Sequence, residues 1–388
     1  MKEGWTYKKL GEVCDILDSQ RKPITKNKRE SGSIPYYGAT GLLDYVKDYI
    51  FDEKLVLLGE DGAKWGAGEN SAYIIEGKAW VNNHAHALRP QRELLLDELL
   101  VYYLNFSNLL SYITGVTVPK LNQEKMRSIE IPIGPIKEQQ SIVDYLDSAF
   151  AKIDAMKANA EKALNEAKAL FQASLKEMLE PKEGWEEKKI KDICETVTDF
   201  VAAGSFAGLR ENVVYNSEKD YAQLVRTTDL KSGFSKGGYV YVNEHAFNYL
   251  YRVNLNEECV ILPNVGVNCG EVYYVTPSIL PYNNNVLGPN AVLVRSKNYS
   301  NHFLSYLFLG NEFQTKLGDI TSHMAQPKFN KTGLKEIEIS VPPLSEQQRI
   351  VDYLDSLKSK VDRLQENYDK ISQECDALKQ AILRQVFE

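Results

Sequence analysis

The chain contains a tandem internal repeat, and this feature restricts its fold more than any other. The string KEGW at residues 2–5 recurs at 182–185, an offset of 180 positions. The string EQQSIVDYLDS at 138–148 recurs at 346–356 as EQQRIVDYLDS, an offset of 208, so the second copy is 28 residues longer between the matched blocks. The sequence therefore predicts two copies of one unit, each with a variable module followed by a constant module.

The constant modules are predicted to be two long helices. Residues 137–180 and 345–388 contain no glycine or proline, and their apolar residues alternate at steps of four and three, which is typical of a coiled coil. Each segment is long enough for a helix of about 66 Å. The predicted helix-pair interface comprises Ile142, Leu146, Ile153, Met156, Ala160, Ala163, Ala167, Leu170, Ile350, Leu354, Leu357, Val361, Leu364, Tyr368, Ile371 and Leu378.

We expect the two helices to pair antiparallel. With their ends matched, three alanines of the first seam face larger residues of the second, as dense packing prefers. The expected pairs are Ala160 with Leu364, Ala163 with Val361 and Ala167 with Leu357. The alternative is that each helix packs only on its own module. A further apolar row on the first helix predicts contact with another helix or subunit; it comprises Phe150, Leu164, Phe171, Leu175 and Met178.

The variable modules have the composition of mixed α+β domains. Short apolar runs such as KLVLLG (54–59), CVILP (259–263) and AVLVR (291–295) predict strands between turns, and residues 94–110 and 302–309 predict short helices. The predicted fold class is therefore α+β, with two globular domains joined by two long antiparallel coiled-coil helices and related by a pseudo-twofold internal repeat. The predicted domains are residues 1–136, 137–180, 181–344 and 345–388.

Charge and cysteine content exclude several classes of protein. The formal net charge is −7, which argues against a protein that holds nucleic acid by bulk attraction alone. Five cysteines without a Cys-x-x-Cys pair predict neither a disulfide scaffold nor a zinc finger. No apolar run is long enough for an export signal or a membrane span. We therefore expect a cytoplasmic protein.

No catalytic or metal-binding constellation is predicted. The sequence lacks a glycine-rich cofactor loop, an Asn-Pro-Pro-Tyr-like methyltransferase turn and a Walker loop. His84 and His86 can share one face of a strand and bind a metal, but structural hydrogen bonding is the favoured interpretation. Glu60, Asp61 and Lys64 resemble a nuclease cluster only loosely, and the same residues form a good turn.

Two linked modules with approximate twofold symmetry match the symmetry of duplex DNA, whose half-sites are read by symmetric protein dimers. Local basic clusters make such contact possible despite the acidic total charge; the string RKPITKNKR at 21–29 suits phosphate binding. A solvated surface loop is the alternative for that string. The candidate DNA-binding residues are Arg21, Lys22, Lys26, Lys28, Arg29, Lys120, Arg210, Arg226, Lys231, Lys236, Arg252 and Lys328.

The repeat, the strings VPKLN (118–122) and QPKFN (326–330), and the runs that end in EQQSIVDYLD and EQQRIVDYLD resemble the specificity (S) subunit of Type I restriction-modification systems. The strings IPYYGATGLLDYV, LLGEDGA and VNNHAHALRP in the first module are similar to strings of that family's target-recognition domains. The resemblance covers the whole chain. The second module, from 200 to 321, contains fewer of these strings.

The resemblance implies a non-catalytic DNA-recognition subunit with target-recognition domains at 1–136 and 181–344, a central conserved helix at 137–180 and a C-terminal conserved helix at 345–388. It implies a bipartite double-stranded DNA target with a gap. It also implies partners: two modification (methyltransferase) subunits that bind S-adenosylmethionine and methylate adenine, and restriction (helicase-nuclease) subunits that use ATP and magnesium. No cofactor is expected in this chain.

Two alternative functions remain open at this point. One is a binding scaffold unrelated to DNA, in which the helices set the distance between two protein-binding modules. The other is a standalone nuclease, which would require Glu60, Asp61 and Lys64 for cleavage.

Overall fold

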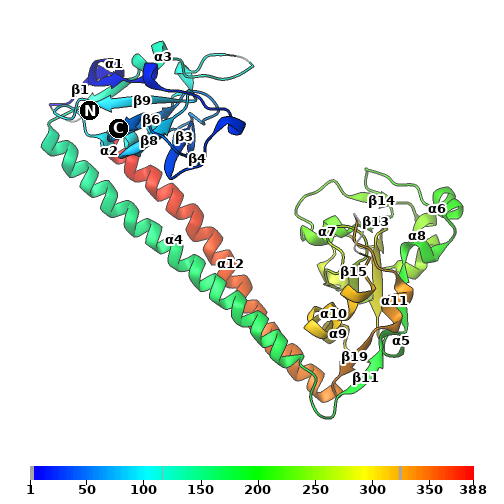
Figure 1. Cartoon of the computed structure of the whole chain (residues 1–388). Helices are drawn as coiled ribbons and strands as arrows, with labels where there is room; N and C mark the ends of the chain where they lie inside the picture. The colour runs from blue at the N-terminus through cyan, green and yellow to red at the C-terminus, as the bar shows by residue number, and fades with distance from the viewer. Residues whose placement is uncertain (1–3, 116, 323–325) are drawn as a thin grey trace. The chain divides into compact units, whose positions relative to one another are not determined.

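The computed structural model describes residues 4–115, 117–322 and 326–388 (Figure 1). The chain divides into two compact units. Unit 1 comprises Met1–Lys162 and Glu366–Glu388, and unit 2 comprises Ala163–Gln365. Two long helices, α4 (Ile136–Met178) and α12 (Leu344–Phe387), contribute to both units, and each unit also contains one β-rich module. No helix in the described ranges is both long and apolar enough to cross a membrane.

The module of unit 1 contains two four-stranded sheets, ordered β2-β9-β6-β7 and β4-β3-β8-β5, and the antiparallel pair β1-β10. Its strands are β1 (Thr6–Lys9), β2 (Cys14–Ile16), β3 (Ile34–Gly38), β4 (Gly41–Val46), β5 (Phe51–Asp52), β6 (Leu55–Gly59), β7 (Ala72–Ile75), β8 (Lys78–Val81), β9 (Ala85–Pro90) and β10 (Glu130–Ile133). Its helices are α1 (Leu10–Val13), α2 (Asp97–Phe106) and α3 (Gln123–Arg127).

The module of unit 2 contains a four-stranded sheet, β12-β18-β15-β16, a three-stranded sheet, β14-β13-β17, and the antiparallel pair β11-β19. Its strands are β11 (Glu186–Lys189), β12 (Thr196–Asp199), β13 (Ala222–Val225), β14 (Val240–Val242), β15 (Cys259–Pro263), β16 (Tyr273–Val275), β17 (Asn285–Leu287), β18 (Ala291–Arg295) and β19 (Glu338–Val341). Its helices are α5 (Ile190–Ile193), α6 (Phe206–Asn212), α7 (Thr227–Lys231), α8 (Glu244–Tyr249), α9 (Asn301–Leu309), α10 (Asn311–Ile320) and α11 (Lys331–Glu336).

The predicted strands lie at the centre of each module because their residues are apolar on both faces. All five residues of β6 and of β15 are buried, as are the first four of β18. Continuous apolar runs of this kind are expected in strands covered on both sides. The predicted helices at 94–110 and 302–309 correspond to α2 and α9, whose buried residues pack on these sheets.

The two modules share one topology although their sequences do not align. The sheets β2-β9-β6-β7 and β12-β18-β15-β16 follow the same order. In both sheets, the strand that comes first in the sequence lies at one edge and pairs with the strand that comes last. In the second sheet of each module, the pair β3 and β8 and the pair β13 and β17 are parallel. The internal repeat therefore extends through the variable modules as well as the constant ones.

Side chains of the matched sequence blocks attach each module to its long helix. The indole Nε1 of Trp5 donates to Glu138 at 2.8 Å in unit 1. Trp185 donates to Glu346 at 3.1 Å in unit 2. In the same way, the hydroxyl of Tyr102 donates to Asp147 at 2.5 Å, and that of Tyr306 donates to Asp355 at 2.6 Å. The string EQQ…DYLD thus recurs because it supplies the acceptors of the same attachment twice.

The helices α4 and α12 run antiparallel within each unit, as predicted (Figure 1). In unit 1 the Cys375 thiol donates to the carbonyl of Ile153 at 3.8 Å, and Lys379 bonds Asp154 at 2.5 Å. In unit 2, Lys168 donates to Gln365 at 2.8 Å. The expected register is wrong, because it would place Lys168 beside residue 356 rather than beside Gln365. The observed contacts are displaced along α12 by about one to two and a half helical turns.

The buried face of α4 also differs from the predicted seam. Met156, Ala163 and Leu170 are exposed, as is Leu378 of α12, whereas the other members of the predicted interface are buried or partly buried. The second apolar row is instead covered by the chain itself: Phe150 packs on the core of unit 1, and Phe171 and Leu175 belong to the core of unit 2. Large side chains remove more apolar area from water than alanines do, so the helix buries this row.

Candidate nucleic-acid interface

Four connections of unit 1 meet at one end of its sheets and are joined by backbone hydrogen bonds. The amide of Asn82 donates to Tyr37 at 3.0 Å, the amide of Glu60 to His84 at 2.8 Å, and the amide of Leu121 to Glu60 at 2.8 Å. We call the described residues of the connections 39–40, 60–71, 82–84 and 114–122 loop cluster 1. Because β3 and β8 are parallel, their following connections necessarily emerge at the same edge.

Unit 2 repeats this arrangement. The amide of Gly288 donates to Val225 at 2.8 Å, the amide of Asn264 to Asn290 at 3.0 Å, and the amide of Phe329 to Asn264 at 3.2 Å. The described residues of the connections 226–239, 264–272, 288–290 and 322–329 form loop cluster 2. Each cluster is therefore a backbone frame of the same design that carries different side chains.

The two PKxN strings occupy equivalent places in these frames. Lys120 forms backbone bridges with Asp61 and Thr114, and Lys328 forms them with Val265 and Ser322. Their side chains differ: the ammonium of Lys120 lies 2.7 Å from the carboxylate of Glu60, whereas Lys328 is exposed and makes no side-chain bond with any described residue. The ion pair raises the pKa of Lys120.

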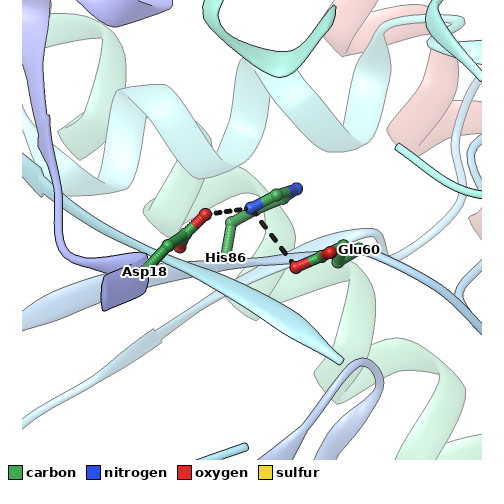
Figure 2. Close-up of side chains that lie close together, drawn as sticks. All are labelled: Asp18, Glu60 and His86. Carbon is green, nitrogen blue, oxygen red and sulfur yellow. Dashed lines mark hydrogen bonds and ion pairs between the residues drawn. The ribbon is translucent and has the colours of Figure 1, made fainter. Parts of the chain in front are cut away.

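A buried ion network lies beneath loop cluster 1, and Figure 2 shows three of its members, Asp18, Glu60 and His86. The guanidinium of Arg21 lies 2.6 Å from Glu60 and 3.3 Å from Asp18, and it also donates to the carbonyl of Ala85 at 2.7 Å. Burial alone would raise the pKa of Glu60, but its hydrogen bonds to Lys120 and Arg21 hold that pKa below its usual value. The carboxylates of Glu60 and Asp18, whose pKa values both lie below the usual range, are therefore charged and paired at neutral pH.

His86 completes the network from strand β9. Its Nδ1 lies 2.6 Å from Asp18 and 3.7 Å from Glu60, and its Nε2 lies 2.7 Å from the carbonyl of Leu121. Acceptor oxygens therefore lie within hydrogen-bonding distance of both ring nitrogens. Burial would raise the pKa of Asp18, but the hydrogen bond and charge of His86 lower it. The network holds strands β2, β6 and β9 in place beneath the cluster.

The donor atoms of Asp18, Glu60 and His86 lie within 4.8 Å of one another, close enough for a metal ion. Two cations, Arg21 and Lys120, already balance the carboxylates in the structure. The arrangement fits an internal ion network better than a metal centre. Both histidines form side-chain hydrogen bonds, as the sequence-based interpretation favours: His86 bonds Asp18, and His84 bonds Asp61 at 2.5 Å.

The structure divides the twelve candidate DNA-binding residues into two sets. Six have side-chain partners in their own unit and are Arg21, Arg29, Lys120, Arg226, Lys231 and Arg252. The other six are exposed and make no side-chain hydrogen bond or ion pair within the described part of the chain; they are Lys22, Lys26, Lys28, Arg210, Lys236 and Lys328. Only the second set has charged groups without a side-chain partner in the described part of the chain.

Sequence reasoning missed other exposed side chains of the clusters. Val267 and Asn290 lie at the surface of loop cluster 2, and Asn290 has a left-handed backbone with φ of 67°. Leu43 lies beside loop cluster 1 and is half exposed. A comparison of the two modules at equivalent backbone positions would have found Val267 and Asn290, but that alignment depends on the shared topology.

Comparisons with known proteins agree with this architecture. The sequence model of the family described as "Type I restriction modification DNA specificity domain" matches residues 2–166 and 182–373, one match for each repeat. The putative type I restriction enzyme specificity subunit S.HindORF215P of Haemophilus influenzae is 27% identical over 362 residues, which covers 91% of this chain and 87% of the relative. The MjaVIII specificity subunit of Methanocaldococcus jannaschii is 22% identical over 414 residues, with coverage of 93% and 87%.

Two solved structures have a similar fold. One is a chain from a structure that describes complex assembly and conformational transition of the type I R-M system; its TM-score is 0.71 at 18% identity. The match covers 100% of this chain and 98% of the solved chain. The HsdS subunit from Thermoanaerobacter tengcongensis has a TM-score of 0.55 at 18% identity, with coverage of 100% and 97%.

The fold and the duplicated loop frame define a two-module recognition protein. The chain belongs to the family of Type I restriction-modification DNA specificity subunits. It is the DNA specificity subunit of such a system. This subunit is itself non-catalytic and carries no cofactor. The α+β fold class and the family resemblance expected from the sequence are thus confirmed.

Proposed function

We propose that each loop cluster reads one half of a bipartite double-stranded DNA target. The observation that carries this proposal is the repetition of the same backbone frame in both units with different side chains at its surface. Equal frames suit the two equivalent groove surfaces of a duplex, and different side chains suit two different half-sites. Exposed cations supply the phosphate contacts: Lys236 and Lys328 in loop cluster 2, and Lys22, Lys26 and Lys28 on the loop 21–29 of unit 1.

The recognition domains proposed here are residues 1–136 and 181–344, separated by the helical segments 137–180 and 345–388. The helices α4 and α12 contain 43 and 44 residues without a break. A pseudo-twofold arrangement of the modules on this helix pair would make helix length set the gap between half-sites. Removing one heptad from each helix shortens the pair by about 10 Å, which corresponds to about three base pairs of DNA.

The proposed protein partners are two modification subunits, which bring S-adenosylmethionine and methylate adenine, and restriction subunits that use ATP and magnesium. Exposed apolar side chains at repeat-equivalent positions support two copies of one partner. Tyr145 of unit 1 and Tyr353 of unit 2 are 48% and 46% exposed. Leu378 and Leu170 are likewise exposed, one in each unit. Equivalent surfaces on the two repeats can bind identical subunits. The proposed location is the cytoplasm.

Partner subunits also account for the acidic charge of the chain. If the modification subunits provide much of the electrostatic attraction, this subunit contributes discrimination between sequences. We expect weak or nonspecific DNA binding by the isolated chain and salt-sensitive, specific binding by the assembled methyltransferase. Tight specific binding by the isolated chain would contradict this division of roles.

The test maps methylated sites after DNA is treated with the assembled methyltransferase. Exchanging residues 16–118 for those of a relative should change one half-site and leave the other intact. Removing one heptad from both α4 and α12 should shorten the gap and preserve both half-sites. If the exchange changes neither half-site, or the gap stays constant, the proposed reading mode is wrong. Absence of any DNA specificity would favour a scaffold unrelated to DNA.

A further inference from the structure

We propose that Leu43 is a specificity-determining residue that contacts the C5-methyl group of a thymine in the half-site read by unit 1. The inference rests on the proposed function and assigns a chemistry to one position of that interface. Four observations support it: a β-bulge, a glycine that leaves room for the side chain, an adjacent basic loop, and the absence of the same device in unit 2.

The first observation is a bulge in the β3–β4 hairpin. Tyr36 pairs with Asp44, and the next residue, Tyr37, pairs with Leu42, so Leu43 has no partner on β3. A bulge of this kind places one extra residue in a strand and redirects its side chain. Bulges are frequent beside functional sites for that reason.

The second observation is the space over Gly38, at the end of β3. A Cβ atom at this position would lie 2.4 Å from Cδ1 of Leu43, a distance that side chains do not adopt. The leucine therefore lies over Gly38, and it does so because position 38 has no side chain. The same Cβ would lie 3.0 Å from the Asn82 amide, which places Leu43 next to loop cluster 1.

The third observation is the basic loop 21–29, which covers this face of the hairpin. The guanidinium of Arg29 lies 2.9 Å from Asp44 and 4.3 Å from the ring centre of Tyr36. The amide of Ile24 donates to the hydroxyl of Tyr36 at 3.0 Å. Arg29 thereby neutralises the acid beside Leu43, and its hydrogen bond lowers the pKa of Asp44. The exposed lysines of the loop remain available for phosphates.

Leu43 is 51% exposed in this polar and cationic setting. An exposed apolar side chain beside a basic loop suits a partner that is anionic and that also presents an apolar group. In the major groove of DNA, the C5-methyl group of thymine is the apolar feature that proteins contact. The neighbouring cations and the continuity with loop cluster 1 favour DNA over a protein partner at this position.

The fourth observation is the corresponding connection of unit 2. Between β13 and β14 the chain forms helix α7 and a glycine-rich segment, in place of a short turn. Its leucine, Leu230, is buried, and its exposed side chains include Lys231 and Lys236. The hairpin contact is therefore a property of unit 1 alone, as expected for a position that distinguishes two half-sites.

The experiment replaces each thymine of the mapped target, one at a time, by deoxyuridine, which lacks only the methyl group. Binding by the assembled methyltransferase is measured for the wild type, Leu43→Ala and Leu42→Ala. Leu42 is the matched control because it is 48% exposed in the same strand but lines a different surface with Tyr73 and Tyr102. We expect one deoxyuridine position in the half-site of unit 1 to weaken wild-type binding about fourfold, the effect of losing one buried methyl group.

The variant Leu43→Ala should bind thymine and deoxyuridine equally at that position, whereas Leu42→Ala should retain the fourfold preference. The inference is overturned if the half-site of unit 1 contains no sensitive thymine, or if Leu43→Ala keeps the preference. It is also overturned if Leu43→Ala prevents assembly with the modification subunits, because Leu43 would then contact protein. Each of these results leaves the two-module reading of DNA intact, because that proposal is tested separately by the exchange of residues 16–118 and by the heptad deletions.

Discussion

The two equivalent lysines, Lys120 and Lys328, allow a sharp test of how the clusters bind DNA. Both occupy the same place in the backbone frame, but Lys120 is bound to Glu60 at 2.7 Å and Lys328 has no side-chain partner among the described residues. A lysine that neutralises one phosphate contributes about 0.9 to the slope of log affinity against log salt. We predict that Lys328→Ala reduces this slope by about 0.9 and that Lys120→Ala leaves it nearly unchanged.

The size of the effect follows from the same relation. Between about 50 and 200 mM salt, one phosphate contact changes affinity about 3.5-fold. The binding defect of Lys328→Ala should therefore be about 3.5 times larger at the lower salt concentration, for specific and nonspecific DNA alike. The assay is a salt titration of DNA binding by the assembled methyltransferase. Equal slope changes for the two variants, or a larger one for Lys120→Ala, would refute the assignment of Lys120 to the internal network.

Three further predictions concern the ion network and the partner surfaces. His86→Ala should destabilise unit 1 by about 3 kcal/mol in denaturant unfolding, because it removes the side chain that lies 2.6 Å from the Asp18 carboxylate and leaves that carboxylate with Arg21 at 3.3 Å, which it shares with Glu60; exposed His84→Ala should change little. The folded-state pKa of Glu60 lies below its usual value of 4.5, so the ionised carboxylate stabilises the fold fully above pH 4.5 and this stabilisation is lost as the pH falls. Glu60→Gln should therefore flatten the decline of melting temperature below about pH 5. Tyr145→Ala combined with Tyr353→Ala should weaken binding of modification subunits in size-exclusion assays without lowering the melting temperature; normal assembly would exclude this surface.

The sequence predicts the repeat, the long helices and the central strands because each depends on local pattern. Strand β6 is a continuous apolar run, and α4 and α12 lack helix-breaking residues. It does not predict which row of α4 is buried, since that depends on the modules that cover Phe150 and Phe171. A heptad pattern alone gives no information on contacts that involve a separate domain.

The candidate site was predicted only in part, for a similar reason. Basic residues are visible in the sequence, but their partners are not: Arg21 bonds Glu60, which is 39 positions away, and Lys331 bonds Asp199 across 132 positions. Such long-range ion pairs are set by tertiary structure. Half of the basic candidates consequently have internal roles, and only the structure separates them from the free cations.

Unit 1 is built from two separate stretches of the sequence, and this affects the order in which the protein can fold. Its core includes Leu383, and the ring of Phe387 lies 5.4 Å from Tyr103 and 5.6 Å from Phe106. These residues leave the ribosome after the whole of unit 2, which is one continuous stretch, Ala163–Gln365. The unit whose sequence begins first is therefore finished last during synthesis, and a premature stop near the carboxyl end would damage the amino-terminal module.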